Sequence, residues 1–514
     1  MNGKPELAGV ADYFSTDHLR AGLRTRALKG ASVTLIAQAS IFCLGILGSI
    51  ILARLLTPTD FGLVTMVLSF GMVLQSFGTN GFIEATIQRE EVHHKQVSTL
   101  FWIGVALSFF LTLVFMALAP AIAWFYNEPR LKPIVLAFAG SILLAGLSTQ
   151  HQALLKRKMQ FYRVSAYETA ATLISLAVAI AMAFWGWGHW ALVARWVVSP
   201  LVITAGAWML CGWRPGLPAR GSGVRPMVRF ALNTYGNYLL GYFGKTIDKI
   251  LLGRFQGSYL LGNYDRAFQL ANALPLQLLS ALTGVAISAF SRLSRDPEKY
   301  RDTYLRTLST IAFVCMPLSA VLTLAGEDLI LLLLGPQWTT AGQVFSIFGS
   351  SIGVLSVYFT HAWLHLSLGT PDRWFRWGLL SFAITVVLFV IGLRYGVVGV
   401  AAAYTASLYI LTVPGLWYAA RPIRLSVSAI WSATWKYFIS ALAAGLLSWL
   451  LLHQSGATSN RFQALAVFPR IITAVCVCAS LYLAMIVALY RGVKPITQLN
   501  SVLREMIPGF CREK

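Results

Sequence analysis

The chain has 514 residues, of which 57% are hydrophobic and only 12% are charged. An ordinary soluble domain carries about 25% charged residues, so a string of soluble domains is excluded. The formal net charge of +22 would suit a nucleic-acid partner if the basic residues formed one patch. They lie instead in short loops between long apolar runs, so we expect no nucleic-acid partner and predict an all-α integral membrane protein.

Fourteen apolar runs are long enough to cross a membrane as helices, which requires about 20 residues each. They cover residues 31–52, 61–82, 99–119, 133–154, 167–185, 190–210, 230–253, 262–290, 304–325, 342–368, 374–393, 397–418, 431–452 and 467–489. The run 262–290 is long and contains Pro275, which predicts a kink or a tilt in that helix.

The basic residues indicate which loops face the cytoplasm. If the N-terminus is cytoplasmic, 28 of the 41 Lys and Arg residues lie in cytoplasmic segments and six lie in the opposite loops. Basic loops face the cytoplasm in multi-pass proteins, so both termini are predicted to be cytoplasmic. Residues 1–30 contain Asp12 and Asp17 and lack a short apolar core, which is typical of a basic cytoplasmic segment rather than a signal peptide.

An internal repeat emerges when the sequence is compared with itself at an offset of 200 residues. Arg54 then coincides with Arg254, and Gly62 coincides with Gly262. Chance is the alternative, because small and apolar residues match easily between helices. A true repeat of six spans predicts two parallel six-helix bundles followed by two extra helices. The predicted parts are a basic segment 1–30, a first bundle 31–212, a basic linker 213–229, a second bundle 230–420, two helices in 431–490 and a cytoplasmic tail 491–514.

Two predicted spans carry polar side chains along one helix face. An ionisable group at the bilayer centre costs about 2.5–3.5 kcal/mol, so such groups usually face the protein interior. At 100° per residue, the run 230–253 has one stripe, made of Asn233, Asn237, Gly241, Lys245 and Asp248, with Lys249 at its edge. The run 262–290 has a second stripe, made of Asp265, Gln269 and Asn272, with Arg266 beside it. The stripes predict a hydrated cavity lining; a buried Lys245–Asp248 ion pair is the alternative.

Few other residues suggest chemistry. Glu84 lies near the cytoplasmic end of the second span and could carry a coupling proton, although an interfacial position in water is the simpler interpretation. His361 and His365 lack a neighbouring carboxylate or Cys, so we expect no metal site. Gly244-Lys245-Thr246 resembles the end of a P-loop, but Leu239 occupies the required earlier Gly position. We therefore expect neither an ATPase nor another enzyme, and no cofactor beyond H+ or Na+ as a coupling ion.

Two stretches resemble a known family. Residues 53–63, Ala-Arg-Leu-Leu-Thr-Pro-Thr-Asp-Phe-Gly-Leu, followed by Ile87-Gln88-Arg89, are similar to the opening of Wzx-type polysaccharide flippases. Residues 248–254, Asp-Lys-Ile-Leu-Leu-Gly-Arg, then 261–267, Leu-Gly-Asn-Tyr-Asp-Arg-Ala, and Pro275 resemble the second-half signature of that family. The family belongs to the superfamily of multidrug, oligosaccharidyl-lipid and polysaccharide exporters.

The resemblance implies a function in a bacterial inner membrane. The substrate would be an undecaprenyl-diphosphate-linked oligosaccharide for O-antigen or exopolysaccharide synthesis, moved from the cytoplasmic to the periplasmic leaflet by alternating access. A polymerase and an export machinery are the expected protein partners, and membrane lipids surround the chain. A lipid II flippase and a cation-coupled multidrug exporter remain the alternatives.

Within this function, the chemistry of the polar residues suggests a hypothetical role for each, although the pair of lysines does not belong to the family pattern. The diphosphate would bind Lys245, Lys249 and Arg266. The sugar path would be lined by Asn233, Asn237, Gln269 and Asn272. The candidates for ion coupling are Asp248, Glu84 and Asp265. Arg54 and Arg254, at matching ends of two spans, would be gate or structural residues.

Overall fold

The computed structural model describes residues 23–79, 81–89, 91–454 and 456–492, and within these ranges it contains helices and no β-strand. The all-α prediction is therefore confirmed for this part of the chain. Most of the predicted basic segment 1–30 and of the tail 491–514 lies outside the described residues. The chain divides into two compact units, Met1–Gly262 and Asn263–Lys514.

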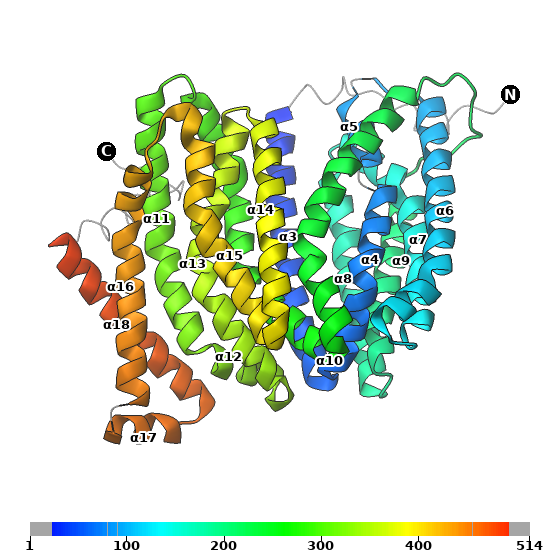
Figure 1. Ribbon diagram of the computed structural model, residues 1–514. Helices are drawn as coiled ribbons and strands as arrows, with labels where there is room; N and C mark the ends of the chain where they lie inside the picture. Colours follow the sequence, from blue (N-terminus) through cyan, green and yellow to red (C-terminus); the bar gives the residue numbers. More distant parts are fainter. Residues whose placement is uncertain (1–22, 80, 90, 455, 493–514) are drawn as a thin grey trace. The chain divides into compact units, whose positions relative to one another are not determined.

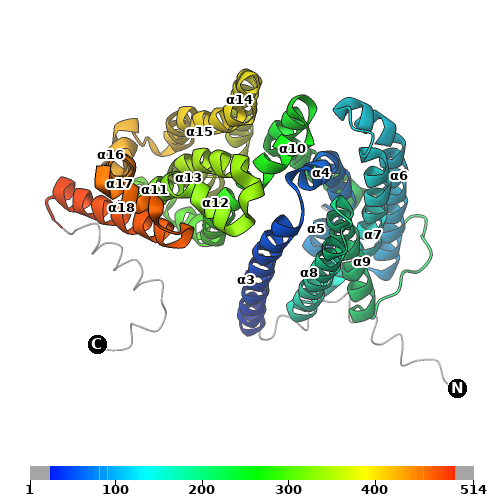
Figure 2. The same cartoon turned by 90° about the horizontal axis from the view of Figure 1, so that it is seen from below.

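The first unit is a set of long helices with one short helix among them. Its helices are α3 (Leu23–Leu55), α4 (Pro58–Thr79), α5 (Phe82–Gln88), α6 (His94–Tyr126), α7 (Leu131–Arg157), α8 (Phe161–Phe184), α9 (His189–Leu210) and the beginning of α10 (Arg225–Leu293). Within the unit α7 packs against α4, α6 and α9, and α8 packs against α3 and α9 (Figures 1 and 2). Helix α7 thus lies at the centre of this unit.

The second unit continues α10 and adds the remaining helices. They are α11 (Pro297–Leu324), α12 (Gly326–Leu334), η1 (Pro336–Trp338), α13 (Thr339–Ser367), α14 (Pro371–Gly392), η2 (Leu393–Tyr395), α15 (Gly396–Ala420), η3 (Arg421–Ile423), α16 (Val427–His453), α17 (Gly456–Ala464) and α18 (Val467–Tyr490). Helix α13 packs against α11 and α15, and α16 and α18 pack against α11 and each other (Figure 2). Asp296 begins α11 as a capping residue, because its Oδ1 accepts a hydrogen bond from the Lys299 amide at 3.2 Å and Pro297 follows it.

Twelve segments of the described chain are long and apolar enough to cross a membrane. One of them, Pro371–Ile423, has 53 residues and covers the two predicted runs 374–393 and 397–418. The predicted run 230–253 is helical but is not among the twelve, and we attribute this to its many Asn, Tyr and Lys residues. Large apolar side chains such as Phe109 and Phe110 are exposed on α6, as expected where a helix faces lipid. The chain is therefore a multi-pass membrane protein.

Helix α10 determines where the two units meet in the sequence. It runs over 69 residues, and its break from helical backbone angles lies at Gly257, with φ 81° and ψ 178°, whereas Pro275 lies inside the helix. Glycine adopts such a positive φ without the steric cost that a Cβ would add. The boundary between the compact units follows Gly262, soon after this break in α10. The division into the bundles 31–212 and 230–420 with a linker 213–229 stays a prediction.

The start of α4 and the segment after Gly257 touch backbone to backbone within the first unit. A Cβ added to Gly62 would overlap the carbonyl of Ser258, and a Cβ added to Gly262 would overlap the carbonyl of Pro58. The Gly262 Cβ would also lie 3.0 Å from the Gly62 amide nitrogen. Both pairs are related by the offset of 200 residues, so the contact is reciprocal. Such a pairwise symmetry is what two copies of one repeat would produce, and it supports a true repeat over a chance match.

Candidate functional site

The residues predicted to line a cavity lie on α10, and the structure describes part of them. Asn233, Asn237 and Lys245 lie in the helix before Gly257, but their side chains are outside the described residues. The described members are Asp248 and Lys249 in the first unit and Asp265, Arg266, Gln269 and Asn272 in the second.

In the first unit, a carboxylate and a lysine are adjacent on α10. The Asp248 side chain is only 3% exposed, and its Oδ1 accepts a hydrogen bond from the Lys249 backbone amide at 2.8 Å. The Lys249 side chain is half-buried. A buried carboxylate requires hydrogen bonds or an opposite charge nearby. The Lys249 amide supplies one such hydrogen bond to Asp248, and the Lys249 side chain places a positive charge in the same short stretch of helix. Whether Lys245 pairs with Asp248 stays a prediction.

Three tyrosines on the same helix form a ladder that the sequence analysis missed. The rings of Tyr235 and Tyr238 lie 6.2 Å apart, and those of Tyr238 and Tyr242 lie 6.1 Å apart. Tyr235 donates to the carbonyl of Val73 at 2.9 Å, and Tyr242 donates to that of Leu68 at 3.0 Å. These bonds attach α10 to α4. The spacing i, i+3, i+7 could have revealed the ladder, because it places the three rings on one helix face.

In the second unit, three of the predicted residues converge on one carboxylate. Oδ2 of Asp265 accepts hydrogen bonds from Arg266 Nη2 at 2.7 Å and from Gln269 Nε2 at 2.9 Å. Asp265 is 1% exposed and Arg266 is 8% exposed. A buried ion pair of this kind costs desolvation energy, which further hydrogen bonds must offset. The sequence placed these groups on and beside one stripe, and the structure brings them into contact.

The fourth residue of this group, Asn272, points elsewhere. Its amide nitrogen donates to the carbonyl of Phe268 at 2.9 Å, one helical turn earlier, and its side chain is buried. Gln269 is exposed. Of the predicted sugar-path residues whose side chains are described, Gln269 is therefore the accessible one.

The candidate coupling residue Glu84 has a structural role in the short helix α5. It lies in the first turn, and its Oε2 accepts a hydrogen bond from the Gly81 amide at 2.5 Å. At the other end of α5, Nη1 of Arg157 donates to the carbonyls of Thr86 at 3.1 Å and of Arg89. The four last carbonyls of a helix need such outside donors. Arg157, in the last turn of α7, thus fixes the end of α5, while coupling by Glu84 stays a prediction.

The two arginines related by the repeat are exposed. Arg54 lies in the last turn of α3, where a positive charge is favourable because of the helix dipole. The Arg254 guanidinium lies 5.9 Å from the ring centre of Phe125 and 5.8 Å from that of Phe255. These contacts are compatible with the structural role that was predicted, and a gating role stays a prediction.

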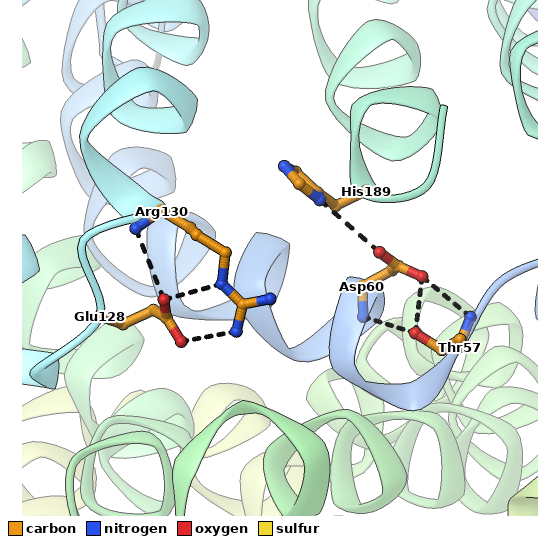
Figure 3. A network of polar contacts seen from close by, with 5 residues as sticks. All are labelled: Thr57, Asp60, Glu128, Arg130 and His189. Carbon is orange, nitrogen blue, oxygen red and sulfur yellow. Dashed lines mark hydrogen bonds and ion pairs between the residues drawn. The ribbon is translucent and has the colours of Figure 1, made fainter. Parts of the chain in front are cut away.

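A polar network at one end of the first unit comprises two sets of contacts, one between the start of α4 and α9 and one within the α6–α7 loop (Figure 3). Asp60 Oδ2 accepts hydrogen bonds from the Thr57 amide at 3.0 Å and from its hydroxyl at 2.6 Å, and the Asp60 amide donates to that hydroxyl at 3.3 Å. Nδ1 of His189, the first residue of α9, lies 3.6 Å from Asp60 Oδ1. The motif Thr-Pro-x-Asp is therefore a capping box at the start of α4, with proline at the first helical position.

The second half of the network is a bidentate ion pair in the loop between α6 and α7. Arg130 donates from Nε and Nη2 to the two carboxylate oxygens of Glu128, each at 2.8 Å. These hydrogen bonds hold the pKa of Glu128 below its ordinary value. The loop therefore keeps its ion pair at neutral pH.

Replacing Thr57 by alanine should destabilise the first unit. The change removes the hydroxyl that pairs with Asp60 in the capping box, and the loss of such a cap costs about 1 kcal/mol. Thermal unfolding of the purified protein in detergent would measure the effect. The control is Thr59→Ala, which changes a threonine in the first turn of α4. An equal loss of stability in both variants would contradict the capping role of Thr57.

Comparison with known proteins supplies the family. A family model described as "Polysaccharide biosynthesis protein" matches residues 51–343, more than half of the chain. The lipopolysaccharide biosynthesis protein WzxC of Escherichia coli is 25% identical over 63% of this chain and 66% of its own length, just under two thirds. The teichuronic acid biosynthesis protein TuaB of Bacillus subtilis is 25% identical over 82% of this chain and 88% of its own.

Further matches concern transport and fold. The succinoglycan biosynthesis transport protein ExoT of Rhizobium meliloti is 24% identical over 65% of this chain and 68% of its own. Among solved structures, lipid II flippase MurJ in an inward closed conformation superposes with a TM-score of 0.69 at 14% identity, covering 89% of this chain and 98% of that one. At this identity the likeness concerns the fold alone. Because the family model covers residues from the end of α3 into α13, the chain belongs to the polysaccharide biosynthesis protein family.

Proposed function

We propose that this protein moves an undecaprenyl-diphosphate-linked oligosaccharide repeat unit from the cytoplasmic to the periplasmic leaflet of a bacterial inner membrane by alternating access. Membership of the polysaccharide biosynthesis family supports the pathway. One of the relatives is named as a transport protein of succinoglycan biosynthesis. Both termini are cytoplasmic in this proposal, as the distribution of Lys and Arg suggests.

The observation that carries the proposal is the polar character of α10. This helix holds the charged residues Asp248, Lys249, Asp265 and Arg266. A diphosphate with sugars cannot enter hydrocarbon without polar partners, because each desolvated polar group costs several kcal/mol. Lysine and arginine are the side chains that bind phosphate oxygens by charge-assisted hydrogen bonds.

The roles within the proposed path follow from the chemistry of each side chain. Lys245, Lys249 and Arg266 bind the diphosphate, and Asn233, Asn237 and Gln269 contact sugar hydroxyls. Asn272 contacts them only after it leaves the carbonyl of Phe268 to which it donates here. The tyrosine ladder adds ring faces to the same helix. Asp248, Asp265 and Glu84 are the proposed sites at which H+ or Na+ couples to transport. The polysaccharide polymerase and export machinery then use the product.

The first experiment is lipid analysis of a strain that lacks this gene and retains the upstream sugar pathway. We expect undecaprenyl-diphosphate-linked repeat units to accumulate and surface polysaccharide to disappear. Mass spectrometry of the accumulated lipid would then identify the repeat unit. An unchanged lipid pool together with sensitivity to cationic drugs would contradict the proposal and favour a multidrug exporter.

Replacing Lys249 by alanine should reduce surface polysaccharide in a complemented strain about tenfold or more. The reason is that a charge-assisted hydrogen bond to phosphate contributes roughly 1.5–3 kcal/mol, and 1.4 kcal/mol corresponds to a factor of ten. Lys249→Arg should retain most of the function. Lys436→Ala, at a membrane lysine of α16 that contacts the Tyr490 ring at 4.2 Å, is the control.

Two further variants assign the phosphate and coupling roles. Lys245→Ala should also reduce transport, because the proposal gives Lys245 a diphosphate oxygen to bind. If Asp248→Asn abolishes transport and Lys245→Ala leaves it unchanged, the phosphate role of Lys245 is wrong. Equal protein levels in the membrane, measured by immunoblot, exclude a loss that merely reflects misfolding.

A further inference from the structure

A cavity of about 870 Å³ lies inside the second unit, between α11, α12, α16 and α18. It is at the end of the unit where α12 and α17 lie (Figure 1). Its volume is within the range of pockets that hold small ligands. No residue predicted for the sugar path lines it, so it is a separate feature of the molecule.

Most of the cavity wall is apolar and part of it is open to the exterior. Met316, Ala320, Phe438 and Leu442 are among the lining residues. Leu442 is 62% exposed although it lines the cavity, so the cavity opens at α16 on the apolar outer surface of the unit. A second cavity of about 180 Å³ shares Met316, Tyr409 and Phe438 with the first, which extends the apolar space along α15 and α16.

The polar end of the cavity contains a partly exposed arginine. Arg470, in the first turn of α18, forms an ion pair with Asp328 of α12. Its side chain is 23% exposed and lines the cavity. A phosphate oxygen in the cavity can therefore accept a hydrogen bond from the guanidinium, because arginine binds phosphate through such donors.

A carboxylate lies at the same end. Glu327 precedes Asp328 in the first turn of α12 and also lines the cavity. It is exposed, and within the described part of the chain it takes part in no ion pair. The polar end thus offers an arginine donor for an anion and a carboxylate for a cation. A zwitterionic headgroup that carries both a phosphate and an ammonium has the complementary charges.

We propose that this cavity binds a phospholipid with an ethanolamine headgroup, taken from the leaflet at the α12–α17 end of the unit. In the orientation proposed above this is the outer leaflet. The phosphate accepts a hydrogen bond from Arg470, and the ammonium lies at Glu327. One acyl chain enters between α11 and α16 through the opening at Leu442. An anionic glycerol headgroup fits less well, because it supplies no cation for Glu327.

Native mass spectrometry of the full-length protein in mild detergent, with equal amounts of phosphatidylethanolamine and phosphatidylglycerol, tests the proposal. The wild type should retain one phosphatidylethanolamine. Arg470→Gln should lower its affinity about tenfold or more, since a hydrogen bond to a charged group contributes roughly 1.5–3 kcal/mol. Glu327→Gln should abolish the preference over phosphatidylglycerol. Arg491→Gln, which removes a charge just after the other end of α18, is the matched control.

A cavity-filling variant guards against effects on folding, because Arg470→Gln also breaks the ion pair with Asp328. Thr323 is exposed and lines the cavity, so Thr323→Trp should displace the lipid while the ion pair remains. Equal lipid occupancy in the wild type, Arg470→Gln and Thr323→Trp would overturn the site. Equal binding of both lipids by the wild type would overturn the headgroup assignment. Displacement of phosphatidylethanolamine by a polyprenyl phosphate would overturn the phospholipid as occupant. The proposal does not depend on the polysaccharide function.

Discussion

Replacing Gly62 by alanine is expected to destabilise the protein by about 3 kcal/mol or more, because the new methyl group would overlap the carbonyl of Ser258. Overpacking of a closely packed site usually costs 1–3 kcal/mol, and side-chain movement relieves part of it. Here the obstacle is backbone, so the two segments must separate to make room. Thermal unfolding in detergent and the yield of monodisperse protein would measure the loss.

The reciprocal geometry allows a sharper test with the second glycine. Gly262→Ala should have a similar cost, because its methyl group would overlap the carbonyl of Pro58. One substitution separates the two backbone segments, so the second methyl group then overlaps less with its carbonyl. The double variant should therefore lose less stability than the two single variants lose together. Gly45→Ala, on α3 with nothing within 4 Å of the added Cβ, is the control. Additive losses would contradict a single shared contact.

Replacing Asp265 by alanine is the second change with a large expected effect. It leaves Arg266 in a site where it is only 8% exposed, without the carboxylate at 2.7 Å. Removing one partner of a buried ion pair typically costs about 3–5 kcal/mol. Gln269 also loses its acceptor. The loss should appear as a lower unfolding temperature in detergent.

An exposed pair and a double variant provide the controls. Asp302 and Arg306 form an ion pair of 2.9 Å on α11, with side chains 62% and 69% exposed, so Asp302→Ala should change stability little. Asp265→Ala combined with Arg266→Met should recover much of the stability, because no buried charge is left behind. A double variant as unstable as Asp265→Ala alone would show that the ion pair is not the source of the loss.

Much of the architecture was predictable because it depends on the medium that surrounds each residue. Runs of about 20 apolar residues are required wherever a helix crosses hydrocarbon, and α6, α7 and α16 follow such runs closely. The run 230–253 shows the limit. Its polar residues weakened the apolar signal, and its hydrogen bonds to α4, from Tyr235 and Tyr242, place it in the first compact unit.

The candidate site was predictable to a smaller extent. Helical spacing placed Asp265 and Gln269 on one face, because residues one turn apart share a face, and it placed Arg266 beside them. It could not determine whether Arg266 was available for a ligand or engaged with Asp265, since both arrangements use the same residues. Glu84 shows the same limit. Its hydrogen bond to the Gly81 amide is local in the sequence, but its role also depends on the other end of α5, where Arg157 of α7 donates to the carbonyl of Thr86.

The sequence by itself determined the membrane class, the helical fold and the family resemblance, because composition, periodicity and motif spacing are properties of the chain alone. The capping box at Thr57 and Asp60 belongs to the same category, since its partners are three residues apart. The tertiary structure decided which distant groups meet. Arg470 and Asp328 are separated by 142 residues, and Gly62 approaches Ser258 only because helices cross there. Such contacts depend on how helices pack, which no local pattern encodes.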